Sequence, residues 1–447
     1  MNNVLIPVND KLVDQPVYGV QGTPRRRQSR TARQSKTISP RGRQLPAVVI
    51  LGGGTNALSI ARSLGRRGVT VYSLNEPTAQ VNYSRYCHRI PLIADANPKT
   101  SESAWVDYLL GRDSDHLRGA VLLSASDLGI ELIARHRELL QEKFLLDESH
   151  APAQLCMLNK LCTYRAAVAA GVPTPRFWVA NSMEQIERLR DELVYPLIVK
   201  PQFSHRFEHA LGDKFLVAKK FEELRAAMET MQEAAVDVLL VEQIPGPDSQ
   251  LCSYYTYLDS EGHALFDFTK RIIRRFPKNM GAACYHITDQ NPEVREISLR
   301  LFRHVGLQGL ANAEFKFDPR DGQLKLIECN ARFTAANGLV ARAGLDLARF
   351  VYHRIVGLAP VELSQYRTGV RLWYPLEDWK AFRQLHRQGE LSWCQWLGSL
   401  AHFQTMPCFD WMDPAPTLIS EFQRASRIAR KFIKAILRVG RKAFKAG

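Results

Sequence analysis

The sequence predicts an α/β unit followed by an α+β unit within one chain of 447 residues. Two observations lead to this prediction. Near residue 50, an apolar run, a glycine turn, a helical pattern and a second apolar run follow one another, which is typical of a doubly wound parallel sheet. From residue 251 onward, β-rich runs alternate with turn residues, which is typical of antiparallel hairpins.

The α/β unit is expected over residues 45–150. Residues 47–51 are apolar and largely β-branched, and Gly52-Gly53-Gly54 follows them directly. Apolar residues then recur at helical spacing as far as Gly65, and 69–74 predicts the second strand. This order of strand, glycine turn, helix and strand opens a parallel sheet.

The α+β unit is expected over residues 151–360. A helix over 155–170 leads into a proline-rich connector, and short strands and helices alternate up to residue 243. Two hairpins should follow, the first over 251–272 around the turn 259–262, the second over 310–330 around the turn 318–322. Beyond it, 361–420 is a Trp-rich extension.

The positive charge lies in the two ends of the chain. The whole sequence has 60 Lys and Arg against 45 Asp and Glu, a net charge of +15. Residues 1–44 hold nine basic and two acidic residues, and 421–447 hold nine basic and one acidic, so the body from 45 to 420 is neutral. Because nucleic-acid binding needs a basic folded surface, the body is not expected to bind nucleic acid.

The two ends differ in pattern. Residues 1–44 predict a disordered basic tail, preferred over a transit peptide because the pattern is hardly amphipathic. Residues 421–447 predict a basic amphipathic helix, which can lie on an anionic membrane or dock on an acidic partner. The alternative is a terminal helix whose apolar face packs on the body while its charges stay solvated.

Composition also bears on the compartment. No apolar run approaches the roughly 18 residues that a membrane span needs, and the N-terminus lacks a secretory signal pattern. The eight cysteines are scattered and form no CxxC pair, which predicts reduced thiols rather than a disulfide framework or a zinc site. The expected location is the cytoplasm, with the membrane surface as a peripheral alternative.

The glycine turn has two interpretations. Gly52, Gly54 and Ala57 fit the pattern G-x-G-x-x-A after a strand, and Glu76 follows about twenty residues later. This pattern is compatible with a dinucleotide site and therefore with an NAD(P)-dependent oxidoreductase. The alternative is that the glycines only permit tight packing between strand and helix.

A candidate metal site lies on the second hairpin. Side chains alternate along a strand, so Glu328 and Asn330 share a face, and pairing of the two strands can bring Glu314 beside them. Two carboxylates and an amide oxygen are hard ligands suited to one or two Mg²⁺ or Mn²⁺ ions. The alternative is a solvated polar face, which is weakened because Asn and Glu are poor strand formers.

Several further residues suit a phosphorylated ligand. Lys200 ends an apolar strand directly before a proline, which aims its ammonium out of the strand end, and Lys160 lies on an earlier helix. Residues 241–246 resemble an edge segment whose backbone could pair with a purine, and Asp248 could hold a ribose. Each of these alone is more often a surface lysine or a turn.

Together, these motifs resemble the ATP-grasp superfamily, over about residues 47–356. The resemblance rests on Asn159-Lys160, the segments 195–201 and 241–244, Glu314, and Glu328-x-Asn330-x-Arg332, which is the superfamily's most specific signature. It is closest to the carboligases related to biotin carboxylase that include D-aspartate ligase. The resemblance implies a Rossmann-like pre-ATP-grasp domain followed by a two-lobed ATP-grasp domain.

The resemblance also implies roles for individual residues. Lys160 and Lys200 would bind the phosphates of ATP, Glu242, Gln243 and Ile244 the adenine edge, and Asp248 the ribose. Glu314, Glu328 and Asn330 would hold the metal. Arg332 would stabilise an acyl phosphate, and Lys270 or Arg271 would hold phosphate or a substrate carboxylate. The loop 201–213 is poor in glycine, unlike that of many relatives, and Lys214 would replace a phosphate contact there.

The function implied is an ATP-dependent carboxylate–amine ligase, which forms an amide through an acyl phosphate and releases ADP and phosphate. An NAD(P)-dependent oxidoreductase and a non-catalytic nucleotide-binding scaffold are the alternatives. The partners would be a small carboxylate and a small amine, which the sequence does not identify. The oligomeric state stays open, with a homodimer among the alternatives.

Overall fold

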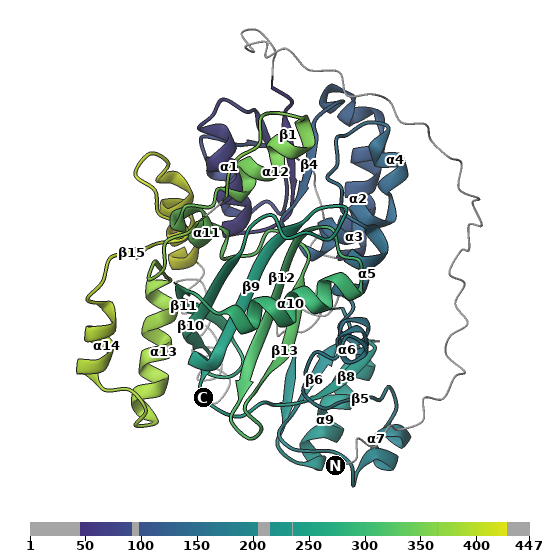
Figure 1. Ribbon diagram of the computed structural model, residues 1–447, viewed down its shortest axis with the longest axis vertical. Helices are drawn as coiled ribbons and strands as arrows, with labels where there is room; N and C mark the ends of the chain where they lie inside the picture. The colour runs from purple at the N-terminus through teal and green to yellow at the C-terminus, as the bar shows by residue number, and fades with distance from the viewer. Residues whose placement is uncertain (1–44, 92–97, 204–214, 235, 364, 427–447) are drawn as a thin grey trace, which may run out of the picture. The chain divides into compact units, whose positions relative to one another are not determined.

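The computed structural model describes residues 45–91, 98–203, 215–234, 236–363 and 365–426 (Figure 1). The predicted tail 1–44, Lys214, and residues 427–447 of the predicted terminal helix lie outside these ranges, whereas 415–426 are helical. Across these ranges, none of the helices has both the length and the apolar character needed to cross a membrane. The described chain forms three sheets, of four, four and seven strands.

The first sheet is parallel, with the strand order β3-β2-β1-β4. All four side chains of β1 are buried, as expected for a parallel strand covered on both faces. The predicted strand, glycine turn, helix and strand are all present, and after β4 the chain forms two helices that meet at His136. The elements are β1 (Val48–Leu51), α1 (Thr55–Gly65), β2 (Val71–Leu74), β3 (His88–Arg89), α2 (Pro98–Leu110), β4 (Val121–Ser124), α3 (Asp127–Arg135) and α4 (Arg137–Gln141).

Two short helices lead to a small antiparallel sheet with the order β5-β8-β6-β7. The helices α7 and α9 lie beside this sheet (Figure 1), and Ile186 of α7 and Leu224 of α9 enter its apolar core. The elements are α5 (Ala151–Leu158), α6 (Lys160–Ala169), β5 (Phe177–Val179), α7 (Met183–Leu189), β6 (Leu197–Pro201), β7 (Leu216–Ala218), α9 (Phe221–Glu233) and β8 (Val238–Glu242).

The large sheet has the order β13-β12-β9-β10-β11-β14-β15, and α10 lies across β9 and β12 (Figure 1). The hairpin of β12 and β13 confirms the prediction for 310–330. The first hairpin differs, because the strand expected from residue 263 begins at Phe268, and only Ala264 bridges back to Leu258 before it. The elements are β9 (Leu251–Leu258), β10 (Phe268–Phe276), β11 (Ala282–Asp289), α10 (Pro292–His304), β12 (Gly309–Asp318), β13 (Gln323–Asn330), α11 (Asn337–Ala343) and α12 (Leu347–Val356).

The Trp-rich extension packs on the rest of the fold. Its short strands β14 (Arg371–Trp373) and β15 (Gln404–Thr405) continue the large sheet. Its helix α13 (Pro375–Arg387) supplies Asp378, whose carboxylate forms a buried ion pair with Arg274 of β10 at 2.6 Å. Aromatic rings join α13 to α14 (Trp393–Leu400). Near the end of the described chain, Asp413 pairs with buried Arg62 of α1 at 2.9 Å and accepts a hydrogen bond from Ser84.

Candidate active site

One row of polar side chains crosses the large sheet. Glu314 on β12 is directly opposite Glu328 on β13 and, on its other side, directly opposite Ser253 on β9. Ser253 is in turn opposite Lys270 on β10. Directly paired residues project from the same face of a sheet, so these four side chains share one face. Asn330 joins them, since its Nδ2 donates to Glu328 Oε1 at 3.4 Å. The predicted pairing of the hairpin is therefore confirmed.

The opposite face of the same strands belongs to the hydrophobic core. Phe315 and Cys329 are buried there together with Phe302 of α10. The register also separates the two candidates for a phosphate or carboxylate contact. Lys270 belongs to the polar row, whereas Arg271 pairs with Cys252 on the core face and forms an ion pair with Asp289 at 3.8 Å. Adjacent residues of a strand point to opposite faces, so Arg271 does not join the row.

Two lysines accompany this row. Lys160 begins α6 and lines a pocket together with Tyr164, Glu328 and Asn330. Lys200 is buried on β6, with its ammonium 6.0 Å from the centre of the Tyr164 ring. Burial, followed by repulsion from Lys160, lowers the pKa of Lys200 to about 8, and the attraction of Glu328 opposes this shift. Lys200 of the small antiparallel sheet therefore lies near Lys160 and near Glu328 of the large sheet.

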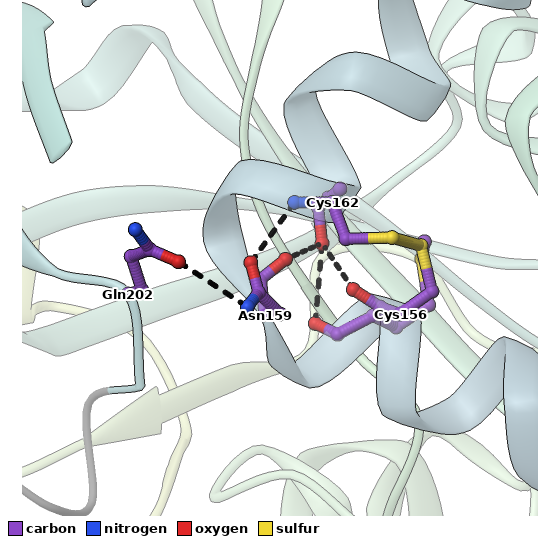
Figure 2. Close-up of a disulfide and its surroundings, with 6 residues drawn as sticks. Cys156, Asn159, Cys162 and Gln202 are labelled. Atoms are coloured by element: carbon purple, nitrogen blue, oxygen red, sulfur yellow. Dashed lines mark hydrogen bonds between the residues drawn. A yellow bond between two sulfur atoms is a disulfide. The ribbon is translucent and has the colours of Figure 1, made fainter. Parts of the chain in front are cut away.

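A disulfide lies beside Lys160, contrary to the prediction that all eight cysteines are reduced. Cys156 of α5 and Cys162 of α6 are bonded, with their Cα atoms 5.2 Å apart (Figure 2). Asn159 stands between the two helices and caps α6, since its Oδ1 accepts the N–H of Cys162 at 2.9 Å. The break between the helices at Asn159 brings together cysteines six positions apart. The prediction was wrong because it relied on the absence of CxxC spacing, whereas the break between α5 and α6 brings these more distant cysteines together.

Asn159 also reaches the strand that holds Lys200. Its Nδ2 donates to Gln202 Oε1 at 3.4 Å (Figure 2), and the N–H of Lys160 donates to the carbonyl of Gln202 at 3.1 Å. Figure 2 shows Gln202 on the opposite side of Asn159 from the disulfide. The start of α6 and the end of β6, which supply the two lysines, are thus held to each other by hydrogen bonds.

Arg332 lies two residues after the end of β13, and its side chain contacts the start of α3. Its guanidinium Nε donates to the carboxylate of Asp127, which begins α3 and lines the same pocket as Lys160. Arg332 also borders a second small cavity with Asp147 and Gln154, and the buried Oε1 of Gln154 has no hydrogen-bond partner among the described residues. The sequence predicted Arg332 but offered no signal for Asp127.

The glycine turn of the first unit packs against protein groups. Gly52 and Gly53 have positive φ angles of 66° and 88°, and a Cβ on Gly52 would lie 2.3 Å from Ser126 Oγ. Asn56, at the start of α1, donates from Nδ2 to the carbonyls of Ala125 at 2.7 Å and Phe333 at 2.8 Å. These contacts favour the packing interpretation of the glycines, because the turn packs against Ala125 and Ser126 and the adjacent Asn56 bonds to Phe333.

The segment predicted to bind a purine is hydrogen-bonded to Pro196, just before β6, and to Lys316 of the large sheet. The N–H of Gln243 donates to the carbonyl of Pro196 at 2.9 Å. The ammonium of buried Lys316 on β12 donates to the carbonyls of Ile244 and Gly246, at 3.0 and 2.9 Å. Burial lowers the pKa of Lys316 to about 8. Lys316 follows Glu314 by two positions, and no sequence motif indicated it.

Two acidic side chains near this segment are paired within the protein. The carboxylate of Glu242 is buried and forms an ion pair with Arg320. Asp248, expected to hold a ribose, forms an ion pair with Arg275 at 2.6 Å and accepts the N–H of Asn279 at 3.1 Å. Both side chains therefore have structural partners, and a role of either in holding a nucleotide stays a prediction.

The chemistry of the polar row bears on the predicted metal. In the described ranges, no group of three or more His, Cys, Asp and Glu side chains could hold a metal ion. The predicted set instead combines two carboxylates with the amide of Asn330, and two like charges placed opposite each other repel unless a cation lies between them. Hard oxygen donors of this kind fit Mg²⁺, which usually keeps several waters or phosphate oxygens as ligands.

Residues 160–357 match the family model of the carbamoyl-phosphate synthase L chain, ATP binding domain. The chain is 25% identical over 299 residues to the D-aspartate ligase of Enterococcus faecium (strain Aus0004), covering 62% of this chain and 69% of that ligase. It is 25% identical over 198 residues to the large chain of carbamoyl phosphate synthase from Clavibacter michiganensis, covering 42% of this chain but only 18% of the synthase.

A solved structure has the same fold. The biotin carboxylase domain of the 2-oxoglutarate carboxylase of Hydrogenobacter thermophilus, crystallised with MgADP, ADP and bicarbonate, superposes with a TM-score of 0.57. It is 19% identical and covers 74% of each chain. At this identity the likeness concerns the fold alone, which is a mixed α/β fold shared with this carboxylase.

Proposed function

We propose that the chain is an ATP-dependent carboxylate–amine ligase of the ATP-grasp superfamily, a proposal supported by the match of residues 160–357 to the ATP binding domain of the carbamoyl-phosphate synthase L chain and by the similarity to a D-aspartate ligase. The observation that supports this proposal most directly is the polar row Glu328–Glu314–Ser253–Lys270, with Lys160 beside it and Arg332 after it. The charges in this region suit a reaction in which negative charge moves between phosphoryl and carboxyl groups.

ATP would lie between the small antiparallel sheet and the large sheet. Lys160 and Lys200 would neutralise its phosphates, because both ammonium groups lie near Glu328 at the end of β13. Lys214 is proposed as a third phosphate contact. The base would lie along Glu242, Gln243 and Ile244, where backbone groups rather than the buried Glu242 carboxylate would contact it.

Glu314, Glu328 and Asn330 would hold one or two Mg²⁺ ions, with phosphate oxygens completing the ligands. When bound, Mg²⁺ supplies positive charge that lowers the repulsion between the phosphoryl group and an attacking oxygen. The two glutamates lie opposite each other across the hairpin, so a cation between them would be attracted by both carboxylates.

The chemistry would proceed in two displacements. A carboxylate oxygen of the substrate forms a bond to the γ-phosphorus while the bond from that phosphorus to ADP breaks. The amine nitrogen then forms a bond to the acyl carbon, phosphate leaves with the C–O bonding electrons, and the amine loses a proton to the leaving phosphate or solvent. Arg332 and Lys270 would stabilise the negative charge on the acyl phosphate and on the tetrahedral species.

The amine is proposed to approach Arg332 from the cavity that contains Asp147 and Gln154. The buried Oε1 of Gln154 has no hydrogen-bond partner in the described part of the chain, and both side chains offer acceptor oxygens to an N–H donor. No side-chain nucleophile is required in this scheme. Binding and orientation of the two substrates, followed by charge stabilisation, supply the catalysis.

The alternative of an NAD(P)-dependent oxidoreductase depended on the glycine turn. A Cβ on Gly52 or on Gly53 would lie within 3 Å of Ser126 or Ala125, and Asn56 closes the turn toward Phe333. This packing accounts for the glycines without a dinucleotide.

The terminal segment 421–447 remains a proposed contact for an anionic membrane. The test is sedimentation with anionic liposomes, comparing the full chain with a chain truncated after residue 420.

The proposed activity is tested by measuring ADP release with Mg·ATP against pairs of amino acids, dipeptides and small carboxylates, with mass spectrometry of the products. We expect one pair to yield ADP, phosphate and an amide in equal amounts. Glu328→Gln should abolish turnover, whereas Glu229→Gln on the exposed face of α9 should not. Thermal stabilisation by NADH and none by Mg·ATP would contradict the ligase assignment.

A further inference from the structure

A third cavity lies apart from the candidate active site, and its volume is about 520 Å³. It is open to solvent and is lined by residues of α1 and the two arginines after it, by α11, by Asp346 at the start of α12, and by the segment 405–410. It shares none of its lining residues with the two small cavities beside Lys160 and Arg332. A cavity of several hundred Å³ is large enough for a small organic ligand.

Arginines dominate the polar part of this cavity. Arg62 lies in the last turn of α1, Arg66 and Arg67 directly follow that helix, and Arg342 of α11 lines the same cavity. Three of the four guanidinium groups have a carboxylate partner: Arg62 pairs with Asp413, Arg66 with Asp410, and Arg67 with Asp346. The described ranges contain no ion-pair partner for Arg342.

The cavity therefore carries excess positive charge. Its four guanidinium groups have three carboxylate partners between them. An ion pair between exposed side chains is worth about 0–1 kcal/mol, so it is easily exchanged for a stronger partner. This applies to Arg67 and Asp346, whose side chains are 41% and 25% exposed, but not to the buried pair of Arg62 and Asp413.

The remaining lining suggests the rest of the ligand. Met406, Pro407 and Phe409 form an apolar side of the cavity, and the Phe409 ring packs edge-on against Trp411. Guanidinium groups bind phosphate and carboxylate oxygens through paired hydrogen bonds, which are stronger than neutral ones. A ligand that satisfies both sides has a doubly charged anionic end and an apolar end.

We propose that this cavity binds a small anionic metabolite through Arg66, Arg67 and Arg342, with a phosphoryl group or paired carboxylates at its charged end. Arg342 donates to the anion without giving up an ion pair of the described chain, and the anion replaces Asp346 as the partner of Arg67. The two basic ends of the chain are excluded as occupants by their own charge. The site lies outside the candidate active site and does not depend on the proposed ligase activity.

Calorimetric titration of the full chain tests the proposal, with sodium pyrophosphate and sodium citrate as separate probes at low ionic strength and without Mg²⁺. We expect one equivalent of at least one probe to bind, and the comparison of probes identifies phosphoryl or carboxylate recognition. Arg342→Ala should weaken binding by about 10-fold or more, since it removes a charge-assisted contact. Arg342 is exposed and forms no ion pair in the described ranges, so this variant should fold.

Two matched variants locate the binding. Arg303→Ala removes an exposed arginine on α10, outside the cavity, and should bind the probe as tightly as the wild type. Lys200→Ala changes the candidate active site and should also leave the affinity unchanged. The proposal is overturned if neither probe binds, if Arg342→Ala binds as well as the wild type, or if Lys200→Ala loses the binding.

Discussion

The charge state of Lys200 should set the pH dependence of ATP binding. Burial and the nearby ammonium of Lys160 lower the pKa of Lys200 to about 8 from its ordinary value of 10.5. The ammonium is therefore charged below pH 8 and neutral above it. If only the charged form neutralises the phosphates, the observed Kd for Mg·ATP rises by the factor 1 + 10^(pH − 8), which is about 1.1 at pH 7 and about 11 at pH 9.

Calorimetry with Mg·AMP-PNP between pH 6.5 and pH 9.5 measures this rise. Lys200→Arg provides the matched control, because a guanidinium stays charged throughout this pH range. The Kd of the Lys200→Arg protein for Mg·AMP-PNP should therefore be nearly independent of pH. Lys316 has a pKa lowered to about 8 as well, and Lys200→Arg separates the two groups because it leaves Lys316 intact. A flat profile for the wild type, or an equal rise in the arginine variant, would refute the assignment of Lys200.

Four further outcomes are expected. Glu328→Gln should lose the thermal shift caused by Mg·ATP, since the proposed metal site loses one of its two carboxylates; a variant that keeps the full shift would contradict this. Asn56→Ala should lower the free energy of unfolding in urea by about 1–3 kcal/mol, because two buried carbonyls lose their donor. Asp378→Ala should cost about 3–5 kcal/mol in the same assay, since Arg274 is left as a buried charge, and a cost under 1 kcal/mol would count against the ion pair. Thiol titration of the denatured, unreduced chain should count six free thiols; eight would show that the disulfide does not form.

Local patterns predicted the part of the site that depends on neighbours in sequence. The turn at 318–322 and the alternation of side chains were enough to place Glu314 opposite Glu328, because a hairpin with a short turn has few possible registers. The same holds for the glycine turn and the start of α1. In both cases the geometry is decided within about 25 residues of chain.

The residues that the sequence did not reveal depend on contacts between distant elements. Asp127 reaches Arg332 only because the first sheet and the large sheet meet. From the sequence alone Lys316 resembles an exposed strand residue, whereas in the fold the segment 244–246 covers it. The choice between Lys270 and Arg271 needed the register of β9 and β10, which the sequence placed only approximately. No periodicity encodes a partner that lies 72 residues away, as Ile244 does from Lys316, or 205 residues away, as Asp127 does from Arg332.

The pairing of Arg62 with Asp413 has a consequence for the order in which the chain is made. The two residues are 351 positions apart, and the guanidinium is buried in a helix that leaves the ribosome early. N-terminal parts of a protein begin to fold during synthesis, yet a buried charge without its partner is strongly unfavourable. The final packing of α1 therefore cannot be completed until the residues near 413 have been translated. Helix α1 is therefore synthesised well before the residue that completes its packing.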